Sequence, residues 1–204
     1  MRPYPSDQFL PIVLLASGEW DTEEEPEMSI STLEGWTVLH GMGFGALFLL
    51  AFAGGLAGMY SLRPEWVTAS GIQERLMRLK VGLWGMAGIA WATVITGSFI
   101  IYPWYRAAPP KGTVDLTNFP RSFLLANPNI AEWHNFGMEW KEHVGWLAPI
   151  AATVVAFAVT YYGPTLAKRV GERRALMVFF VVAFLAAVAA GIFGAFINKV
   201  APIH

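Results

Sequence analysis

Histidines and carboxylates concentrate in residues 131–149, which read AEWHNFGMEWKEHVGWLAP. A helix turns by about 100° per residue, so Glu132, Glu139 and His143 share one face. His134 lies nine residues before His143 and therefore points to the opposite side. We expect the His143 face to look into a helix bundle and the His134 face to meet solvent or a partner.

His40 and His143 are the pair whose positions suit a metal-centred cofactor. Each residue stands directly before an apolar run, the two runs have nearly equal length, and both are read in the same direction through a membrane. The two imidazoles should therefore lie at similar depth, which suits axial ligation of one b-type haem. Glu139 would orient His143 by a hydrogen bond, and Gly43 would leave space beside a ring held by His40.

Basic residues near the same membrane face are candidates for pairing with haem propionates: Arg106, Lys111, Arg121 and Lys141. Three other interpretations remain open. The histidines could be boundary residues of a cofactor-free subunit, or one of them could hold a chlorophyll-type pigment. Alternatively, His40, Glu139 and His143 could bind a non-haem metal. The absence of cysteine excludes disulfides, iron–sulfur clusters and c-type haem attachment.

The composition indicates that lipid is the solvent of this chain. Only 14% of the residues are charged and 55% are hydrophobic, whereas a soluble domain carries about 25% charged residues. Four apolar segments reach the ~20 residues that cross a bilayer as a helix: residues 33–60, 81–102, 144–162 and 175–197. The predicted fold is an all-α integral membrane protein, a four-transmembrane-helix bundle. A net charge of −1 argues against a nucleic-acid partner.

Basic residues also predict the orientation, because they favour the cytoplasmic side of a membrane. Of the 14 Lys and Arg residues, those on or beside the two short connections are Arg63, Arg75, Arg78, Lys80, Lys168, Arg169, Arg173 and Arg174. Both termini and the long second connection are therefore predicted to lie outside. The predicted location is a bacterial inner (plasma) membrane, crossed several times.

The predicted divisions of the chain are residues 1–32, 33–102, 103–128 and 129–204. The first is an outer segment with a short apolar run, read as an interfacial segment or a signal peptide, followed by an acidic run. The second and fourth are transmembrane hairpins. The third is a loop that is longer than a simple connection between two helices needs to be. We expect this loop to be ordered over the outer face. Asn129 is expected to cap the third helix and Pro149 to kink it.

Glycines on the first apolar segment form two small-x-x-x-small pairs, Gly41 with Gly45 and Gly54 with Gly58. Such pairs permit close approach of neighbouring helices. They also leave room for a flat macrocycle beside the backbone. The pattern is compatible with both interpretations.

The histidines His40 and His143, together with this glycine pattern, resemble the membrane-anchor b-type cytochrome subunits of respiratory complexes. The resemblance implies an electron-transfer subunit that has the bilayer and other subunits of a complex as partners. Those subunits commonly place histidine pairs for two haems across the membrane. In this chain the inner membrane half of the predicted spans has no histidine, so at most one haem is expected. The sequence has no Gly-rich phosphate loop or nucleophile elbow, so it gives no sign of an enzyme acting alone.

Overall fold

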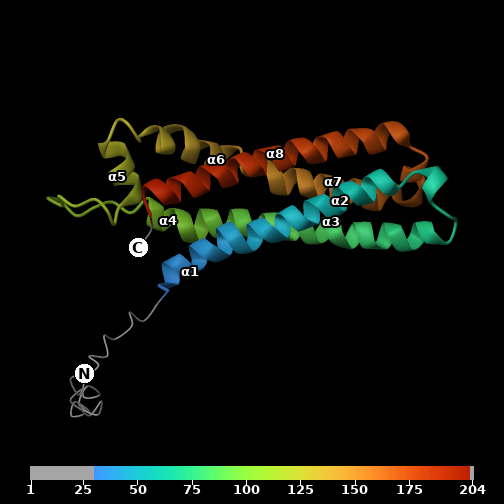
Figure 1. The fold of residues 1–204 in the computed structure, drawn as a ribbon, viewed down its shortest axis with the longest axis horizontal. Coiled ribbons are helices and arrows are strands. Elements are labelled where there is room, and N and C mark those ends of the chain that lie inside the picture. The colour runs from blue at the N-terminus through green and yellow to red at the C-terminus, as the bar shows by residue number, and fades with distance from the viewer. Residues whose placement is uncertain (1–29, 203–204) are drawn as a thin grey trace, which may run out of the picture. The chain divides into compact units, whose positions relative to one another are not determined.

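The computed structural model describes residues 30–202, which are drawn in colour in Figure 1. The N-terminal apolar run and the acidic run singled out in the sequence lie outside the described residues. The described part of the chain contains all four apolar segments predicted to cross a membrane.

Four long helical spans form the described chain, and the predicted all-α membrane bundle is confirmed. Each span is long and apolar enough to cross a membrane. Span 1 is Thr32–Ser61, span 2 is Gly71–Tyr105, span 3 is Trp133–Ala167 and span 4 is Val170–Val200. Span 1 contains α1 (Thr32–Val38) and α2 (Phe44–Ser61), span 2 contains α3 (Gly71–Thr96) and α4 (Tyr102–Tyr105), and span 3 contains α6 (Glu139–His143) and α7 (Leu147–Tyr162); span 4 is α8 (Val170–Val200).

The four spans run antiparallel and close into a ring. Successive spans are neighbours, and α8 returns to pack beside α2, so that spans 1 and 3 lie across a diagonal. We call the end where spans 1 and 3 begin the His40 end. The opposite end, where span 4 begins, is the Arg173 end. Neither name refers to a side of the membrane.

Local hydrogen bonds explain where span 1 begins and where α7 ends. The Ser31 hydroxyl accepts the Glu34 backbone N–H at 3.2 Å, and the Glu34 carboxylate accepts the Ser31 N–H at 2.8 Å. This reciprocal pair satisfies two of the N–H groups that a helix start leaves open. At the other end, α7 stops at Gly163, whose φ of 52° favours glycine because it has no Cβ.

The start of span 3 differs from the prediction. Asn129 does not cap it; the side chain of Asn127 instead accepts the Asn129 N–H at 3.0 Å, and the Asn127 carbonyl accepts the N–H groups of Ile130 and Ala131, each at 3.0 Å. The predicted break near Pro149 is present, because residues 144–146 form turns between α6 and α7. Proline lacks the N–H that would continue the helical ladder.

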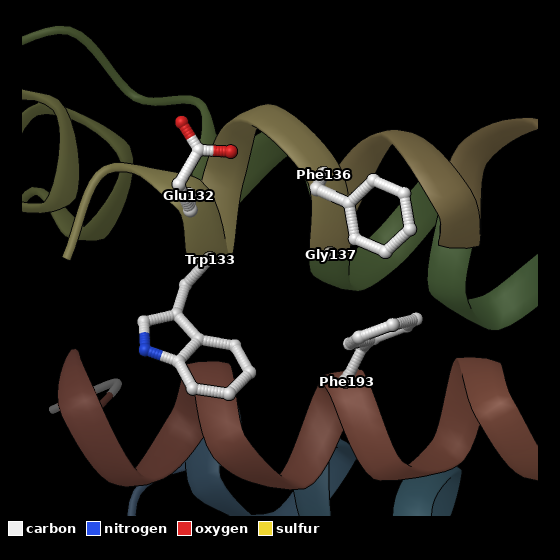
Figure 2. A pocket seen from close by; sticks show the side chains of 5 residues that line it. All are labelled: Glu132, Trp133, Phe136, Gly137 and Phe193. Atoms are coloured by element: carbon white, nitrogen blue, oxygen red, sulfur yellow. The ribbon is translucent and has the colours of Figure 1, made fainter.

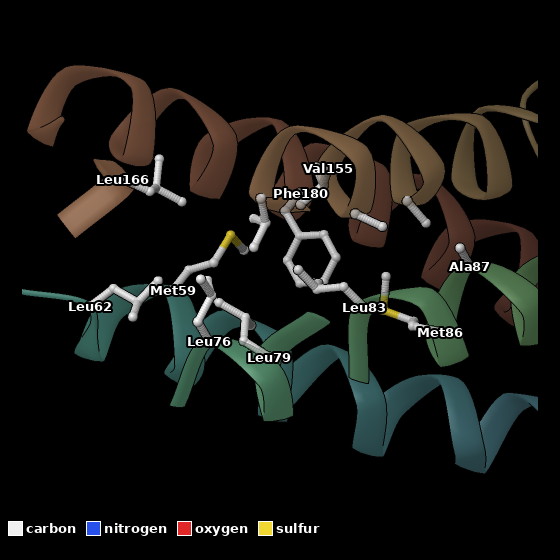
Figure 3. Packing of buried hydrophobic residues seen from close by; sticks show 13 residues of the cluster. Met59, Leu62, Leu76, Leu79, Leu83, Met86, Ala87, Val155, Leu166 and Phe180 are labelled. Atoms are coloured by element: carbon white, nitrogen blue, oxygen red, sulfur yellow. The ribbon is translucent and has the colours of Figure 1, made fainter. Parts of the chain in front are cut away.

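A tight apolar core fills the Arg173 half of the bundle and draws on all four spans (Figure 3). Met59, Leu83, Val155 and Phe180, one from each span, are almost completely buried. These side chains come from the apolar runs and lie on the inward faces of the spans. The core therefore fixes the bundle far from the histidines.

Gly55 lets span 1 pack closely against this core, whereas the neighbouring Gly54 faces open space. A Cβ added at Gly55 would lie 3.0 Å from Leu83 Cδ2 and 3.1 Å from Phe180 Cζ, whereas one at Gly54 would meet nothing within 4 Å. At Gly58 the added atom would lie 2.8 Å from a Leu79 methyl. Of the Gly54–Gly58 pair, Gly54 therefore lies on an open face and Gly58 on a packed one.

Arg173, a residue of α8, links the helical segments that meet at the Arg173 end of the bundle. Its side chain is buried, and its guanidinium donates to the carbonyl oxygens of Leu62 and, at 2.8 Å, Ala167. These carbonyls lie at the end of span 1 and at the end of the turn Gly163–Ala167. The C-terminal carbonyls of helices lack intrahelical partners. The single guanidinium of Arg173 therefore satisfies carbonyls at the ends of two helical segments.

The long second connection lies at the His40 end. It contains α5 (Pro120–Ala126), whose Leu124 is fully buried. Leu124 belongs to a small apolar cluster with Tyr105, Met138 and Ile197. This cluster joins the connection to spans 2, 3 and 4.

Candidate functional site

Three π-helical segments lie at the His40 end, one in each of the first three spans. They are Leu39–Gly43, Gly97–Ile101 and Trp133–Met138. Such segments are uncommon and often occur at functional sites, because the extra residue re-aims nearby side chains. Here they contain His40, Gly97 and His134, respectively, so this end is the candidate site.

The ring of His40 is held against span 2. Its Nδ1 lies 3.2 Å from the Thr96 hydroxyl oxygen, and that hydroxyl itself donates to the Ala92 carbonyl at 2.7 Å. The hydroxyl oxygen therefore accepts from an Nδ1–H, a tautomer that puts the lone pair on Nε2. The Thr93 carbonyl is a further acceptor beside the ring.

Glycine is required where His40 meets span 2. A Cβ at Gly97 would lie 2.8 Å from Cε1 of His40, closer than real side chains approach. The ring thus occupies the place that a side chain at position 97 would fill. Gly43, predicted to leave space beside a macrocycle held by His40, lies next to Leu39 of its own turn, with 3.2 Å between an added Cβ and Cδ1 of that leucine.

Lys141 makes the corresponding contact on the other side of the bundle. Its Nζ would lie 2.7 Å from a Cβ added at Gly194 of α8, and its charge acts on the His40 ring. Within residues 30–202 Lys141 has no ion pair or hydrogen bond with another side chain. We call His40, Gly97, Lys141 and Gly194 the His40–Lys141 layer. It places an imidazole and an unpaired ammonium in one cross-section of an apolar bundle.

His134 is the buried histidine of residues 131–149. Its side chain is 7% exposed, its Nδ1 lies 2.9 Å from the Tyr105 hydroxyl, and its Nε2 accepts from Nε of Arg121 at 3.4 Å. Since Arg121 belongs to α5, this cluster ties the second connection to spans 2 and 3. The arginine predicted to face a propionate is therefore engaged with a histidine.

The predicted inward face of span 3 is wrong. Glu132, Glu139 and His143 are all exposed in the isolated chain, and the side chain of His143 is 72% exposed. The Nδ1 of His143 donates to the Glu139 carbonyl at 2.9 Å, and the Glu139 carboxylate lies 3.5 Å away. Glu139 and His143 lie together, as the helical spacing predicted, but that spacing could not say which side of the helix meets the other spans.

Two further residues predicted to pair with haem propionates are Arg106 and Lys111. The guanidinium of Arg106 lies over the Tyr102 ring at 5.2 Å, and Lys111 is exposed on the second connection. Among residues 30–202 no three His, Asp or Glu side chains converge on a possible metal position. The non-haem site of His40, Glu139 and His143 is therefore not formed.

Two polar atoms near the layer are buried without a partner in the described chain. They are Nε1 of Trp140 and Oε1 of Glu142. The Glu142 side chain also acts on the Tyr102 hydroxyl. A buried unsatisfied polar atom is uncommon and calls for an explanation such as a bound group.

The layer was only partly visible in the sequence. His40 and Lys141 were singled out, whereas Thr96, Gly97 and Gly194 were not paired with them. The available signal was a threonine and a glycine in adjacent positions of an apolar run. Nothing in that run indicates which helix they face.

No family model matches the chain, and neither a curated protein nor a solved structure shows significant similarity to it. The class of protein therefore rests on the fold: the chain is a multi-pass integral membrane protein with a four-helix bundle.

Proposed function

We propose that this chain is a subunit of a membrane-bound electron-transfer complex and that its His40–Lys141 layer binds one b-type haem. The observation that carries the proposal is an imidazole and an unpaired ammonium in one cross-section, flanked by Gly97 and Gly194. Ionisable groups within membrane spans are costly and commonly mark functional sites. Haem requires an axial ligand for iron and cations for its propionates.

The residues of the layer fit these requirements. The Thr96 hydroxyl orients His40 in the tautomer that leaves Nε2 able to ligate iron. The ammonium of Lys141 would pair with a propionate, and the glycines let the His40 ring and the Lys141 chain lie close to spans 2 and 4. Haem in this position would carry one electron at a time.

The second axial ligand predicted from the sequence was His143, and the pairing stays a prediction. His143 lies on the span diagonally opposite His40 and faces outward. Ligation of one iron by both histidines requires α6 to turn inward. Residues 144–146, which are not helical, are where such a rotation would be absorbed. Ligation by His40 alone requires no such rotation.

An optical spectrum of the purified protein, oxidised and then reduced with dithionite, tests the haem. We expect a b-type α-band in the wild type and its loss in His40→Ala. His143→Ala is the matched variant, because it removes an exposed imidazole at similar depth. It should abolish the band only if α6 turns inward.

A wild-type sample produced with ample haem that shows no α-band would refute the haem and leave the cofactor-free structural subunit. A magnesium macrocycle, which needs only one imidazole, would appear instead as a pigment extractable into organic solvent. Retention of the full band in His40→Ala would place the haem elsewhere.

We also propose that both ends of the described chain face outward, in a bacterial inner membrane, with the Arg173 end in the cytoplasm. The support is the excess of basic residues on and beside the two short connections. The chain has no cysteine, so a single introduced thiol is a unique label. We expect an impermeant maleimide to label Lys111→Cys in intact cells and Lys168→Cys only after lysis; the reverse pattern would invert the topology.

A further inference from the structure

Basic side chains gather at the Arg173 end of the bundle. Residues 61–80 and 163–174, which hold the two short connections and the span ends beside them, contain eight Lys or Arg residues and three Glu residues. Glu74 and Glu172 are paired with neighbouring arginines, whereas Glu65 is exposed and has no ion pair in the described chain. This end therefore carries a surplus of positive charge that the described residues do not neutralise.

Arg173 brings the two short connections together. Its guanidinium donates to the carbonyl oxygens of Leu62 and Ala167, one on each connection. The residues that follow these two carbonyls in the chain are basic. We call them the basic surface: Arg63, Lys168 and Arg169. Although these residues are far apart in the sequence, one buried side chain holds their backbones close to each other.

Aromatic rings, and not carboxylates, hold the guanidinium of Arg63. Its Cζ lies 3.9 Å from the centroid of the Tyr60 ring and 5.0 Å from that of the Trp66 ring. Within residues 30–202 its side chain has no ion pair or hydrogen bond. Stacking on a ring uses the face of a guanidinium and leaves the N–H donors at its edge free. Such a planar fork of donors can bind two oxygens of a phosphate.

Arg169 is held in a similar way on the other connection. Its Cζ lies 5.2 Å from the centroid of the Tyr162 ring, and one of its terminal nitrogens donates to the Glu172 carboxylate at 3.0 Å. Lys168, beside it, is exposed and has no ion pair in the described chain. The basic surface thus has three cations and one bound carboxylate. Because like charges repel, an anion placed among these cations would be attracted.

A phosphate carried by a lipid fits this surface better than a soluble anion. The two connections join helices that are long and apolar enough to cross a membrane, and a bilayer has its headgroups at the ends of such helices. Large apolar side chains near the same ends of the spans are exposed: Met77, Val81, Tyr161 and Val178. They offer a surface to acyl chains, whereas the surplus positive charge favours an anionic headgroup over a zwitterionic one.

We propose that the basic surface binds the phosphate of an anionic phospholipid. The proposal depends neither on haem nor on the side of the membrane that the Arg173 end faces. Its test is the lipid retained by the full-length protein after reconstitution in equal parts of phosphatidylcholine, phosphatidylethanolamine and phosphatidylglycerol, followed by detergent washing and mass spectrometry. The first two lipids carry the same phosphate with a balancing ammonium, so the comparison isolates the net charge of the headgroup.

We expect the wild type to retain phosphatidylglycerol over the two zwitterionic lipids. Arg63→Gln and Arg169→Gln should each reduce this preference about fivefold, the effect of one basic residue near an anionic membrane surface. Arg63→Lys should fall between the wild type and Arg63→Gln, because an ammonium keeps the charge but lacks the planar fork. Lys199→Gln is the matched control, because it removes the same charge from the other end of α8, about 45 Å away. It should leave the preference unchanged.

A pocket at the His40 end supplies a second control, because it offers no cation to a phosphate (Figure 2). Its volume is about 220 Å³, and the residues that line it are Glu132, Trp133, Phe136, Gly137 and Phe193. The rings and the glycine make its walls apolar, and the carboxylate of Glu132 is turned away from the rings. A lipid chain in this pocket would be held without regard to its headgroup. Phe136→Ala should therefore leave the preference for phosphatidylglycerol unchanged.

Equal retention of the three lipids by the wild type would overturn the proposal, and so would an unchanged preference in the variant that carries both Arg63→Gln and Arg169→Gln. An equal loss in Lys199→Gln would also overturn it, because the effect would then follow net charge and not the surface. Inorganic phosphate added at constant ionic strength should not displace the lipid; displacement would assign the surface to free phosphate instead. Lipid preference is compared among variants with the unfolding midpoint of the wild type, and Arg63→Lys supplies that comparison if a glutamine variant unfolds.

Discussion

Arg173→Ala is expected to lower the midpoint of thermal unfolding in detergent by roughly 6–12 °C. The guanidinium is buried and donates to carbonyls of Leu62 and Ala167. Hydrogen bonds from charged groups contribute about 1.5–3 kcal/mol each, and unpaired buried carbonyls carry a further penalty. A loss of about 3 kcal/mol corresponds to that shift for a chain of this size.

Arg174→Ala is the matched control, because the neighbouring arginine is exposed and has the same charge. It should change the midpoint little, since isolated surface charges contribute little to stability. Arg173→Lys should fall between the two, because an ammonium lacks the planar fork that reaches two carbonyls. Equal shifts for Arg173→Ala and Arg174→Ala would show that the two carbonyl contacts do not stabilise the bundle.

Gly55→Leu is expected to destabilise the bundle by about 3 kcal/mol, the upper end of the range for overpacked cores. Even a Cβ at this position would lie 3.0 Å from Leu83 and 3.1 Å from Phe180. A branched side chain therefore must displace a core residue or push span 1 away. The measurement is the fraction of monodisperse protein in detergent together with its unfolding midpoint.

Gly54→Leu separates core packing from docking. No atom lies within 4 Å of a Cβ added there, so the isolated chain should keep its stability or gain slightly from the better helix former. If the chain is a structural subunit whose glycine face meets a neighbour, the same change should weaken assembly without altering the midpoint. Unaffected stability in Gly55→Leu would contradict the packing described for span 1.

The sequence determined the membrane fold through hydrophobic length alone. Runs of apolar residues long enough for a bilayer can only be satisfied as helices, because no water is available to their backbone groups. The helices nevertheless extend beyond these runs. Span 2 begins at Gly71, so Arg75, Arg78 and Lys80 lie on its first turns rather than in a connection. Hydropathy cannot detect such polar turns.

Helical periodicity correctly grouped Glu139 with His143 on span 3 but did not orient them. Both side chains are exposed, and so is Glu132. Lys141, two residues before His143, turns inward to Gly194 instead. In a membrane span both faces are largely apolar, so the polarity contrast that orients a soluble helix is weak.

The sequence alone is thus enough to predict four membrane-spanning helices and to single out His40 and Lys141 as candidate site residues. The sequence does not show that the His40 ring fills the space at Gly97, that His134 is buried against Tyr105, or that His143 is exposed. These outcomes depend on which helices are neighbours and on how each helix is rotated about its axis. Both are set by packing between residues far apart in the chain, such as Gly55 with Phe180, and not by the spacing within any one segment.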